Sequence, residues 1–564
     1  MRFGARYRRW PEIDINLSES LDNEASSEKK SISTLLVELA LNRYVFGCTE
    51  DGQPFAVKPG GHVVRMLRGG KTSLRAELSK AYYRLHRKTA PQQALANALL
   101  TLEGEALESD PREVHLRVAS AKGDIWLDLG DTAETVIKID ADGWRVVNAD
   151  VPVLFRRTAL TGVMPEPEPG GHIDLLWKHL NTAPADRPLV LAWLVAAIID
   201  AEMPHPILAQ FGEQGTGKST VSKRLVALID PSPALLRKSP RDPESWVTAA
   251  QGSWVVGLDN LSVVPDWLSD SLCRAVTGDG DVRRALYTDA GLAVFQFRRC
   301  ILLNGIDVGA LRGDLADRIV RIDLNRIEED ARANEKKLDQ LWAADHPIIL
   351  GSVLSLAAET IARQPSVRLA KSPRMADFAH ILAAIDQLRG TDGLTRYADQ
   401  AQTMAEDSLS SDPFLAAMDE AQVDFTGKAV ELLAKVTPDS DRWRPPKNWP
   451  KDPRAVTSLL RRNAPALRKT GWIIEEDKDR DHFVIWTVVH PEKVGNRPPQ
   501  DPQGPQSAET ADSADIKYGR THDVADVVQT PESELPPISR CIRCGFPLHR
   551  SLIEAGETTH PLCD

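Results

Sequence analysis

The sequence contains few cysteines, and half of them lie close together. Six cysteines in 564 residues do not make the disulfide framework of a secreted protein. Three of them, Cys541, Cys544 and Cys563, fall within the last 24 residues. This crowding indicates a metal site instead of disulfide bonds.

Net positive charge and long apolar runs are also absent. The formal net charge is −11, so nucleic-acid binding cannot be inferred from overall charge and would need a local basic face. The longest apolar run, which begins at Pro188, is shorter than the ~18 residues of a membrane span and suits a buried helix. The N-terminal MRFGARYRRW lacks the apolar centre of a secretory signal. We therefore expect a cytoplasmic protein with no membrane partner.

A glycine-rich loop matches the phosphate-binding pattern G-x-x-x-x-G-K-[ST]. The loop, GEQGTGKST, lies between an apolar strand at 207–211 and a helical pattern, which is the context this motif requires. Glycines let backbone N–H groups surround phosphates, and the helix N-terminus adds positive potential. Lys218 is expected to contact the outer phosphates of ATP, and Ser219 to ligate Mg²⁺. The expected nucleotide-binding residues are Gly212, Gly215, Thr216, Gly217, Lys218, Ser219 and Thr220.

A second apolar strand, within SWVVGLDNLS (253–262), ends in Asp259, where an acid that organises Mg²⁺ belongs. The next residue is Asn260, at a position where many nucleotide hydrolases have a second carboxylate that activates water. An asparagine can hold a water molecule but cannot take its proton. Phosphoryl transfer depends largely on positioning and charge, so we predict a working but slow ATPase, with Asp279 or Asp281 as substitute acids.

Two further residues complete the predicted catalytic set. A third strand, 300–305, ends in Asn304, which is placed to orient the attacking water or to sense the γ-phosphate. Arg318 precedes another apolar strand. It is either an arginine finger presented to a neighbouring subunit or one half of an ion pair with Asp314 or Asp317, and the residues leave both readings open.

The segment VTGDGDVRRALYTDAGLAVFQFRRCILLNGID resembles superfamily 3 helicases, and among them the ATPases of phage, poxvirus and mobile-element primase-helicases. The resemblance covers roughly 175–324 and rests on a T-G-G-D…R-x-L-Y…F…N order of residues. It implies an AAA+-like core in a hexameric ring, with single-stranded DNA in a central channel. Thr288 departs from the family, which often has a lysine there. The residues that carry the match are Thr277, Gly278, Leu286, Tyr287, Phe297 and Asn304.

By that resemblance, the hairpin between the second and third strands faces the channel. Its DNA contacts would be Arg283 and Arg284, or Arg298 and Arg299. Adjacent arginines on a glycine-flanked hairpin suit phosphate contacts, which position DNA without reading its sequence. The alternative is a solvated basic turn.

Two smaller modules are expected downstream. A basic helix followed by strands at 472–475 and 483–488 has the order of a winged helix, which suits duplex DNA or, alternatively, protein docking. A C-x2-C-x15-H-x2-C spacing in the tail predicts a structural Zn²⁺ site, with His549 as a substitute ligand. The basic residues of the helix are Arg461, Arg462, Arg468 and Lys469, and the zinc ligands are Cys541, Cys544, His560 and Cys563.

The predicted fold is α/β, with a P-loop NTPase (AAA+-like) core. Asp128 and Asp131 in the N-terminal part fit the polar ends of a hairpin better than a polymerase-type metal site, because no supporting His or basic set is evident. The expected domains are a flexible N-terminus (1–30), a small α+β domain (31–165), the ATPase core (170–330), a helical region (331–435), a winged-helix-like domain (440–491), a disordered linker (492–537) and a zinc-binding tail (538–564).

The favoured function is an ATP-driven DNA helicase or translocase that replicates a phage or an integrated mobile element. Two other functions compete: an ATP-binding assembly switch on DNA that hydrolyses slowly, and a regulatory or defence ATPase that recruits partners through its zinc tail. The sequence shows no convincing primase catalytic set, so a separate primase or polymerase is an expected partner.

Overall fold

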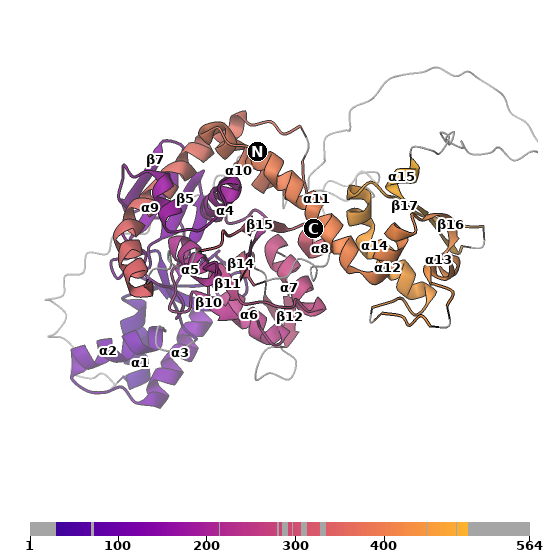
Figure 1. Cartoon of the computed structure of the whole chain (residues 1–564). Coiled ribbons are helices and arrows are strands. Elements are labelled where there is room, and N and C mark those ends of the chain that lie inside the picture. The colour runs from indigo at the N-terminus through magenta and orange to yellow at the C-terminus, as the bar shows by residue number, and fades with distance from the viewer. Residues whose placement is uncertain are drawn as a thin grey trace, which may run out of the picture. The chain divides into compact units, whose positions relative to one another are not determined.

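The computed structural model describes residues 30–494, except 69–72, 214, 279–280, 285–291, 296, 306–312, 328–333, 371, 441, 447 and 481 (Figure 1). The chain divides into two compact units, Met1–Arg497 and Pro498–Asp564, and all described residues belong to the first. The predicted linker beyond 494 and the zinc-binding tail lie outside the described residues, as do 1–29, Asp279 and the Leu286–Tyr287 pair.

The N-terminal part combines three helices with a four-stranded sheet of order β1-β2-β3-β8. Helix α2 buries Leu74, Leu78 and Tyr82 on one face, the spacing of an amphipathic helix, and helices α1 to α3 share one hydrophobic cluster. The spacing of apolar residues in the sequence predicts helices at 72–88 and 91–103, and these are observed as α2 and α3. The bounds are α1 Ile32–Leu41, β1 Val45–Cys48, β2 Pro54–Val57, β3 Val63–Met66, α2 Leu74–His86, α3 Gln92–Leu107 and β8 Phe155–Arg156.

An antiparallel meander, β4-β5-β6-β7, follows in the chain. Its apolar residues Val118, Leu127 and Ile137 belong to the same hydrophobic cluster as the central parallel sheet. The predicted α+β domain therefore shares its core with the part that follows it. The bounds are β4 Val118–Ala121, β5 Asp124–Asp128, β6 Val136–Asp140 and β7 Gly143–Val147.

The central sheet has five parallel strands in the order β10-β11-β14-β9-β15. Its strands are short apolar runs because helices bury both faces of a parallel sheet. The apolar run from Pro188 is helix α4, whose residues are almost all buried, as predicted. Two short 3-10 helices, η1 Ile173–Lys178 and η2 Pro184–Asp186, precede it. The strands are β9 Ile207–Phe211, β10 Leu236–Lys238, β11 Val255–Asp259, β14 Cys300–Asn304 and β15 Ile319–Asp323.

Helices connect these strands, and a hairpin lies between β11 and β14 in the chain. The hairpin pairs β12 Asp281–Arg284 with β13 Leu292–Phe295. The helices are α4 Arg187–Ile199, α5 Lys218–Ile229, α6 Pro243–Gln251, α7 Asp266–Thr277 and α8 Gly313–Ala316.

A helical region follows the sheet. It consists of α9 Glu335–Arg363, η5 Gln364–Ser366, α10 Ala376–Arg389 and α11 Gly393–Ser411. The stretch Glu335–Ser366 is long and apolar enough to cross a membrane by length and composition, but 56% of its apolar window is buried inside the protein. A core helix packed against α4 and η1 has the same properties.

The C-terminal part has the element order helix, strand, helix, helix, strand, strand, helix. Its sheet is antiparallel, with β18 paired to both β16 and β17. The hydrophobic cluster of this part includes residues from Ala405 onward, and β16 supplies the second neighbour of β18, so both extend it before the predicted boundary of 440. The bounds are α12 Pro413–Glu420, β16 Asp424–Lys428, α13 Ala429–Val436, α14 Pro453–Lys469, β17 Ile473–Lys478, β18 Val484–Val489 and α15 Pro491–Val494.

Candidate nucleotide-binding site

The loop between β9 and α5 has a backbone that requires glycine. Gly212, Gly215 and Gly217 have φ angles of 152°, 88° and 79°, a region that L side chains rarely adopt. A Cβ atom on Gly212 would also lie 2.8 Å from Thr216 Oγ1. The glycines therefore shape a tight turn at the carboxyl end of a central strand, as the motif predicts.

The N-terminus of α5 is prepared for an anion. The helix begins at Lys218, its N-cap Gly217 makes no side-chain capping bond, and its first turn holds no acid. The first backbone N–H groups of the helix therefore keep their positive potential. Lys218 Nζ donates to the carbonyl oxygens of Gly212 (2.6 Å) and Glu213 (2.9 Å), which holds the ammonium over the loop.

Ser219 and Asp259 are brought together although 40 residues separate them. Ser219 Oγ donates to Asp259 Oδ1 at 2.9 Å. One side chain comes from the first turn of α5 and the other from the end of β11, so both lie at the carboxyl edge of the sheet. A hydroxyl and a carboxylate are hard oxygen ligands of the kind that Mg²⁺ takes. The donor set fits the predicted metal.

Asn260 has a conformational reason to be an asparagine. Its φ angle is 56°, in the left-handed region, where Asn is among the few non-glycine residues that occur readily. Its exposed side chain follows Asp259 directly, while its backbone N–H donates to Asn304 Oδ1 at 2.7 Å. A glutamate here would be in a strained backbone conformation, a constraint that the sequence pattern does not reveal.

Asn304 connects four elements of the site. Its side chain is buried, its Oδ1 accepts from the Asn260 backbone, and its Nδ2 donates to Ser222 Oγ on α5 at 2.9 Å. Ser222 Oγ in turn lies 2.9 Å from Gln210 Oε1 on β9. The amide thus ties the end of β11 to the loop helix and the central strand. Its role in sensing the γ-phosphate stays a prediction.

Arg318 lies inside the protein and is paired. Only 8% of the residue is exposed, and its Nη1 lies 2.6 Å from Asp314 Oδ1 and 2.7 Å from the Asp314 carbonyl oxygen. Arg374 reaches the same carboxylate at 3.1 Å. Of the two readings left open by the sequence, the ion pair is present in this structure. The role of Arg318 as a finger stays a prediction.

The arginines expected at the channel fall in different settings. Arg283 and Arg284 lie on strand β12, and their side chains are outside the described residues. Arg298 Nε donates to the Thr277 carbonyl oxygen at 3.0 Å. Arg299 Nε donates to the Ala250 carbonyl oxygen at 2.6 Å, and burial lowers the pKa of Arg299 to about 10. Both Arg298 and Arg299 are partly exposed.

The basic residues of α14 are largely engaged within the chain. Arg461 Nε donates to Glu476 at 2.8 Å, and Arg468 Nη2 donates to the Ile474 carbonyl oxygen at 2.9 Å. Lys469 Nζ lies 2.5 Å from Asp317 Oδ1. Arg462 is exposed and, within the described part of the chain, makes no ion pair. The predicted basic face is therefore reduced in this structure.

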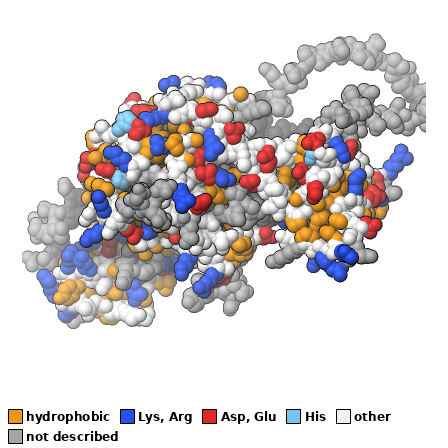
Figure 2. Space-filling view, in the orientation of Figure 1, with side chains coloured by type: hydrophobic (Ala, Val, Ile, Leu, Met, Phe, Trp, Pro, Cys, Tyr) orange, Lys and Arg blue, Asp and Glu red, His pale blue; other side chains and the backbone are white. Residues whose placement is uncertain are grey.

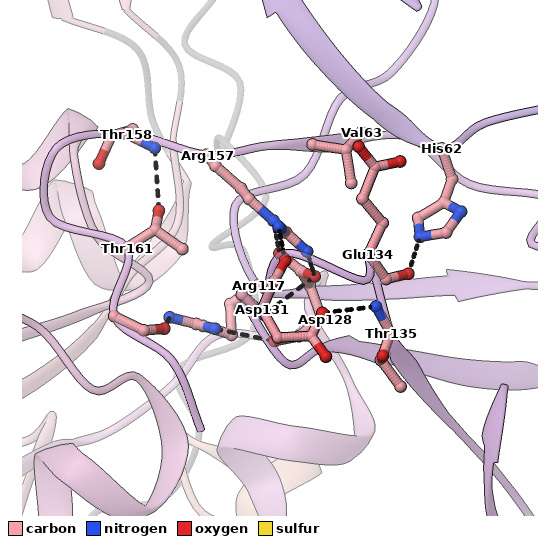
Figure 3. A network of polar contacts seen from close by, with 12 residues as sticks. His62, Val63, Arg117, Asp128, Asp131, Glu134, Thr135, Arg157, Thr158 and Thr161 are labelled. Carbon is pink, nitrogen blue, oxygen red and sulfur yellow. Dashed lines mark hydrogen bonds and ion pairs between the residues drawn. The ribbon is translucent and has the colours of Figure 1, made fainter. Parts of the chain in front are cut away.

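Asp128 and Asp131 belong to a polar network with a basic partner that the sequence did not suggest (Figure 3). Arg157 donates to both carboxylate oxygens of the buried Asp128, at 2.6 and 2.9 Å. The Asp131 carboxylate accepts from the Thr135 backbone at 2.8 Å. This pairing supports the polar hairpin ends, and no group of three or more potential metal ligands occurs among the described residues.

Two family models match the chain. One, the actinomycete integrative conjugative element replication protein, matches residues 173–407, and the other, the C-terminal domain of this replication protein (AICE RepA), matches residues 413–502. Together they cover more than half of the sequence. No curated protein matches the chain.

Solved structures match only distantly. The apo C-terminal region of NrS-1 is 11% identical with a TM-score of 0.35, and the match covers 82% of this chain and 100% of that one. The SCCmec type IV Cch active helicase is 10% identical with a TM-score of 0.38, over 80% and 94% of the two chains. At such scores these likenesses do not bear on function. On the family models, the chain belongs to the actinomycete integrative conjugative element replication proteins and is a replication protein of a mobile element.

Proposed function

We propose that this replication protein binds Mg²⁺–ATP at the loop 212–219 and hydrolyses it to drive a ring-forming DNA helicase or translocase of the superfamily 3 type. The observation that carries the proposal is the contact between Ser219 and Asp259 beside the uncapped N-terminus of α5. A carboxylate, a hydroxyl, an ammonium and the first N–H groups of a helix without a side-chain cap meet at one edge of a parallel sheet, where open α/β folds bind their ligands.

Each residue of the site has a separate task. Lys218 exchanges the carbonyl oxygens of Gly212 and Glu213 for phosphate oxygens when nucleotide binds. Ser219 and Asp259 would hold Mg²⁺, which would supply charge neutralisation at the phosphates. Asn304 fixes the position of the Asn260 backbone and therefore the end of the strand that carries Asp259.

Asn260 sets the expected rate. Its amide can orient a water molecule but cannot accept the proton, so hydrolysis depends on positioning and charge alone. The same observation favours the second candidate function, an ATP-binding switch that assembles on DNA and turns over slowly. The two functions differ in whether DNA accelerates hydrolysis.

DNA association follows from membership of a replication-protein family, and the contacts remain proposals. We assign single-stranded DNA to the β12–β13 hairpin with Arg283, Arg284 and Arg298, and duplex DNA to Arg462 on α14. A hexameric ring, a zinc-stabilised tail and a separate primase or polymerase complete the proposal. The hairpin contacts and the hexamer rest on the resemblance to superfamily 3 helicases. The α14 contact rests on the winged-helix order of elements, the zinc on the C-x2-C-x15-H-x2-C spacing, and the separate primase on the lack of a convincing primase catalytic set.

The test is steady-state ATPase activity of the wild type and of Lys218→Ala, with and without single-stranded DNA. Lys223→Ala is the matched control, because Lys223 is a lysine on the same helix that lies outside the phosphate loop. Its side chain is exposed and makes a long surface ion pair, with Nζ 3.8 Å from Glu335 Oε1. We expect DNA-stimulated hydrolysis in the wild type and the control, and none in Lys218→Ala. Hydrolysis absent even with DNA would favour the switch, and hydrolysis indifferent to DNA would favour a regulatory ATPase. Equal rates for wild type and Lys218→Ala would overturn the site.

A further inference from the structure

Helix α2 in the N-terminal part carries an exposed basic surface in an acidic protein. Between residues 74 and 88 the sequence has five Lys or Arg residues and a single acid, Glu77. All five cations are exposed: Arg75, Lys80, Arg84, Arg87 and Lys88. In Figure 2, Lys and Arg side chains lie at the surface in the region that α2 occupies in Figure 1. A chain of net charge −11 thus has a local basic face, and this face is distant in sequence from the arginines that we assigned to DNA under the proposed function.

The cations of α2 differ from the basic residues next to them in the chain, which are paired. Arg65 pairs with Glu77 at 2.7 Å and with Glu134 at 3.1 Å, and Arg68 pairs with Glu103 at 2.7 Å. In the described part of the chain, none of the five α2 cations makes an ion pair. The acid of α2, Glu77, is already engaged by Arg65 and by Tyr44.

Most of the exposed cations gather in the C-terminal half of α2 and at its end. Lys80 and Arg84 are four residues apart, so they lie on the same side of the helix, and Arg87 follows as the C-cap residue, with a left-handed φ of 54°. Tyr83 lies beside them and is 49% exposed, which offers an aromatic ring next to the charges. Interaction with the helix dipole stabilises cations in the last turn and could by itself explain the arginines there. It does not explain Lys80, which lies in the middle of α2, where the dipole effect is weak.

The adjoining helix, α3, begins without acidic residues. Only a short connection separates α2 from α3, whose exposed first residues Gln92 and Gln93 and the following Asn97 are polar and uncharged. No acidic residue occurs between Glu77 and Glu103. Glu103 itself lies about 17 Å along the helix axis from Gln92. Cations, amide groups and a helix N-terminus are donors to phosphate oxygens.

We propose that the α2 face, defined by Lys80, Tyr83, Arg84 and Arg87, binds the phosphate backbone of DNA independently of sequence. The family shows a replication protein, so DNA is the polyanion it meets in its work. Unpaired cations on one face contribute by releasing counterions, which makes such binding strongly salt-dependent. DNA binding by this face requires neither the nucleotide site nor hydrolysis. The face would therefore keep DNA bound while the proposed ATPase hydrolyses ATP.

The test is DNA binding by the full chain without nucleotide, measured by fluorescence anisotropy across a salt series. The triple variant Lys80→Ala/Arg84→Ala/Arg87→Ala should bind about tenfold or more weakly at low salt. Its slope of log affinity against log salt should fall by about 2 to 3 for duplex DNA. Separate single-stranded and duplex oligonucleotides show which form the face prefers.

Two controls separate this face from general charge effects. Lys336→Ala/Lys337→Ala/Arg363→Ala removes the same charge from exposed positions on α9 and should bind DNA as the wild type does. Arg84→Lys/Arg87→Lys keeps the charge and should retain affinity. Lys218→Ala should also bind normally, so a failed ATPase proposal would leave this result unchanged. Equal salt slopes for the α2 and α9 triple variants would overturn the proposal. Binding to anionic lipid vesicles is measured in parallel, and an α2 triple variant that loses vesicle binding but keeps DNA binding would overturn it as well.

Discussion

Replacing Arg117 with methionine is expected to lower the free energy of unfolding by about 3 to 5 kcal/mol. The Arg117 side chain is fully buried, and its Nε lies 2.9 Å from Asp230 Oδ1. Its other nitrogens donate to the carbonyl oxygens of Asp128 (2.8 Å) and Gly162 (3.0 Å). Asp230 is the C-cap residue directly after helix α5, and its second carboxylate oxygen accepts from the backbone N–H of Trp254 at 2.7 Å. One guanidinium therefore joins the meander to the helix and strand that carry the nucleotide site.

The size of the effect follows from what the substitution leaves behind. Arg117→Met removes three donors and leaves a buried carboxylate with only its backbone partners, which is the costly way to break a buried ion pair. Arg117→Lys keeps the charge but not the planar fork, so an intermediate loss is expected. The double variant Arg117→Met/Asp230→Asn should lose less than the two single losses combined, because neither change then leaves an unpaired charge.

The assay is urea denaturation followed by circular dichroism, with Arg363→Met as the control. Arg363 is exposed, so its replacement should change stability by no more than about 0.5 kcal/mol. A loss below about 1 kcal/mol for Arg117→Met, the scale of a surface pair, would refute the reasoning. Strict additivity in the double variant would refute it as well.

Four further predictions follow from the described residues and the sequence. Asn304→Ala should lower ATPase activity and destabilise the protein by about 1 to 3 kcal/mol, because the Asn260 N–H and the buried Ser222 hydroxyl lose a partner; ATPase assays and denaturation check this. Asp259→Ala should abolish hydrolysis while Asn260→Asp raises its rate, and unchanged rates in both would remove this strand from the site. Burial lowers the pKa of His205 to about 3 from 6.5, so its contribution to stability is complete above pH 6.5 and declines as the pH falls toward 3. Between a pH above 6.5 and pH 5, the free energy of unfolding of the wild type should therefore fall by about 2 kcal/mol more than that of His205→Phe. Denaturation of both proteins at the two pH values measures this difference. Cys541→Ser/Cys544→Ser should remove bound zinc, measured by mass spectrometry of the metal content.

Local pattern and strand order were enough to predict much of the candidate site. Ser219 and Asp259 meet because the ends of parallel strands share one edge of a sheet, which a strand–loop–helix motif and an acid-ended strand already imply. Helices α2 and α3 were readable because their apolar residues repeat at helical spacing. Alternation of apolar and polar residues predicts the first meander strand at 115–118, three residues before the observed Val118–Ala121. Its register is set by pairing with β5, not by its own residues.

Contacts between distant segments could not be predicted. Arg117 meets Asp230 across 113 residues, and Lys469 meets Asp317 across 152, so neither partner is marked by local sequence. Asn260 looked like a missing acid because a left-handed φ angle leaves no trace in an apolar strand pattern. The start of the C-terminal part was placed too late because β16, interrupted by Gly427, is a weak strand signal until its pairing with β18 is known.

The hydrophobic cluster shared by the meander and the central sheet has a consequence for how such proteins are inherited. The family match begins at residue 173, whereas the core around the nucleotide site includes Val118, Leu127 and Ile137. Suppose that recombination joined two related replication genes at residue 173. The meander would then come from one parent and the central parallel sheet from the other, although their apolar side chains pack in one core. Viable hybrids should therefore have crossover points upstream of Arg117, so that the meander and the nucleotide site pass together from one element to the next.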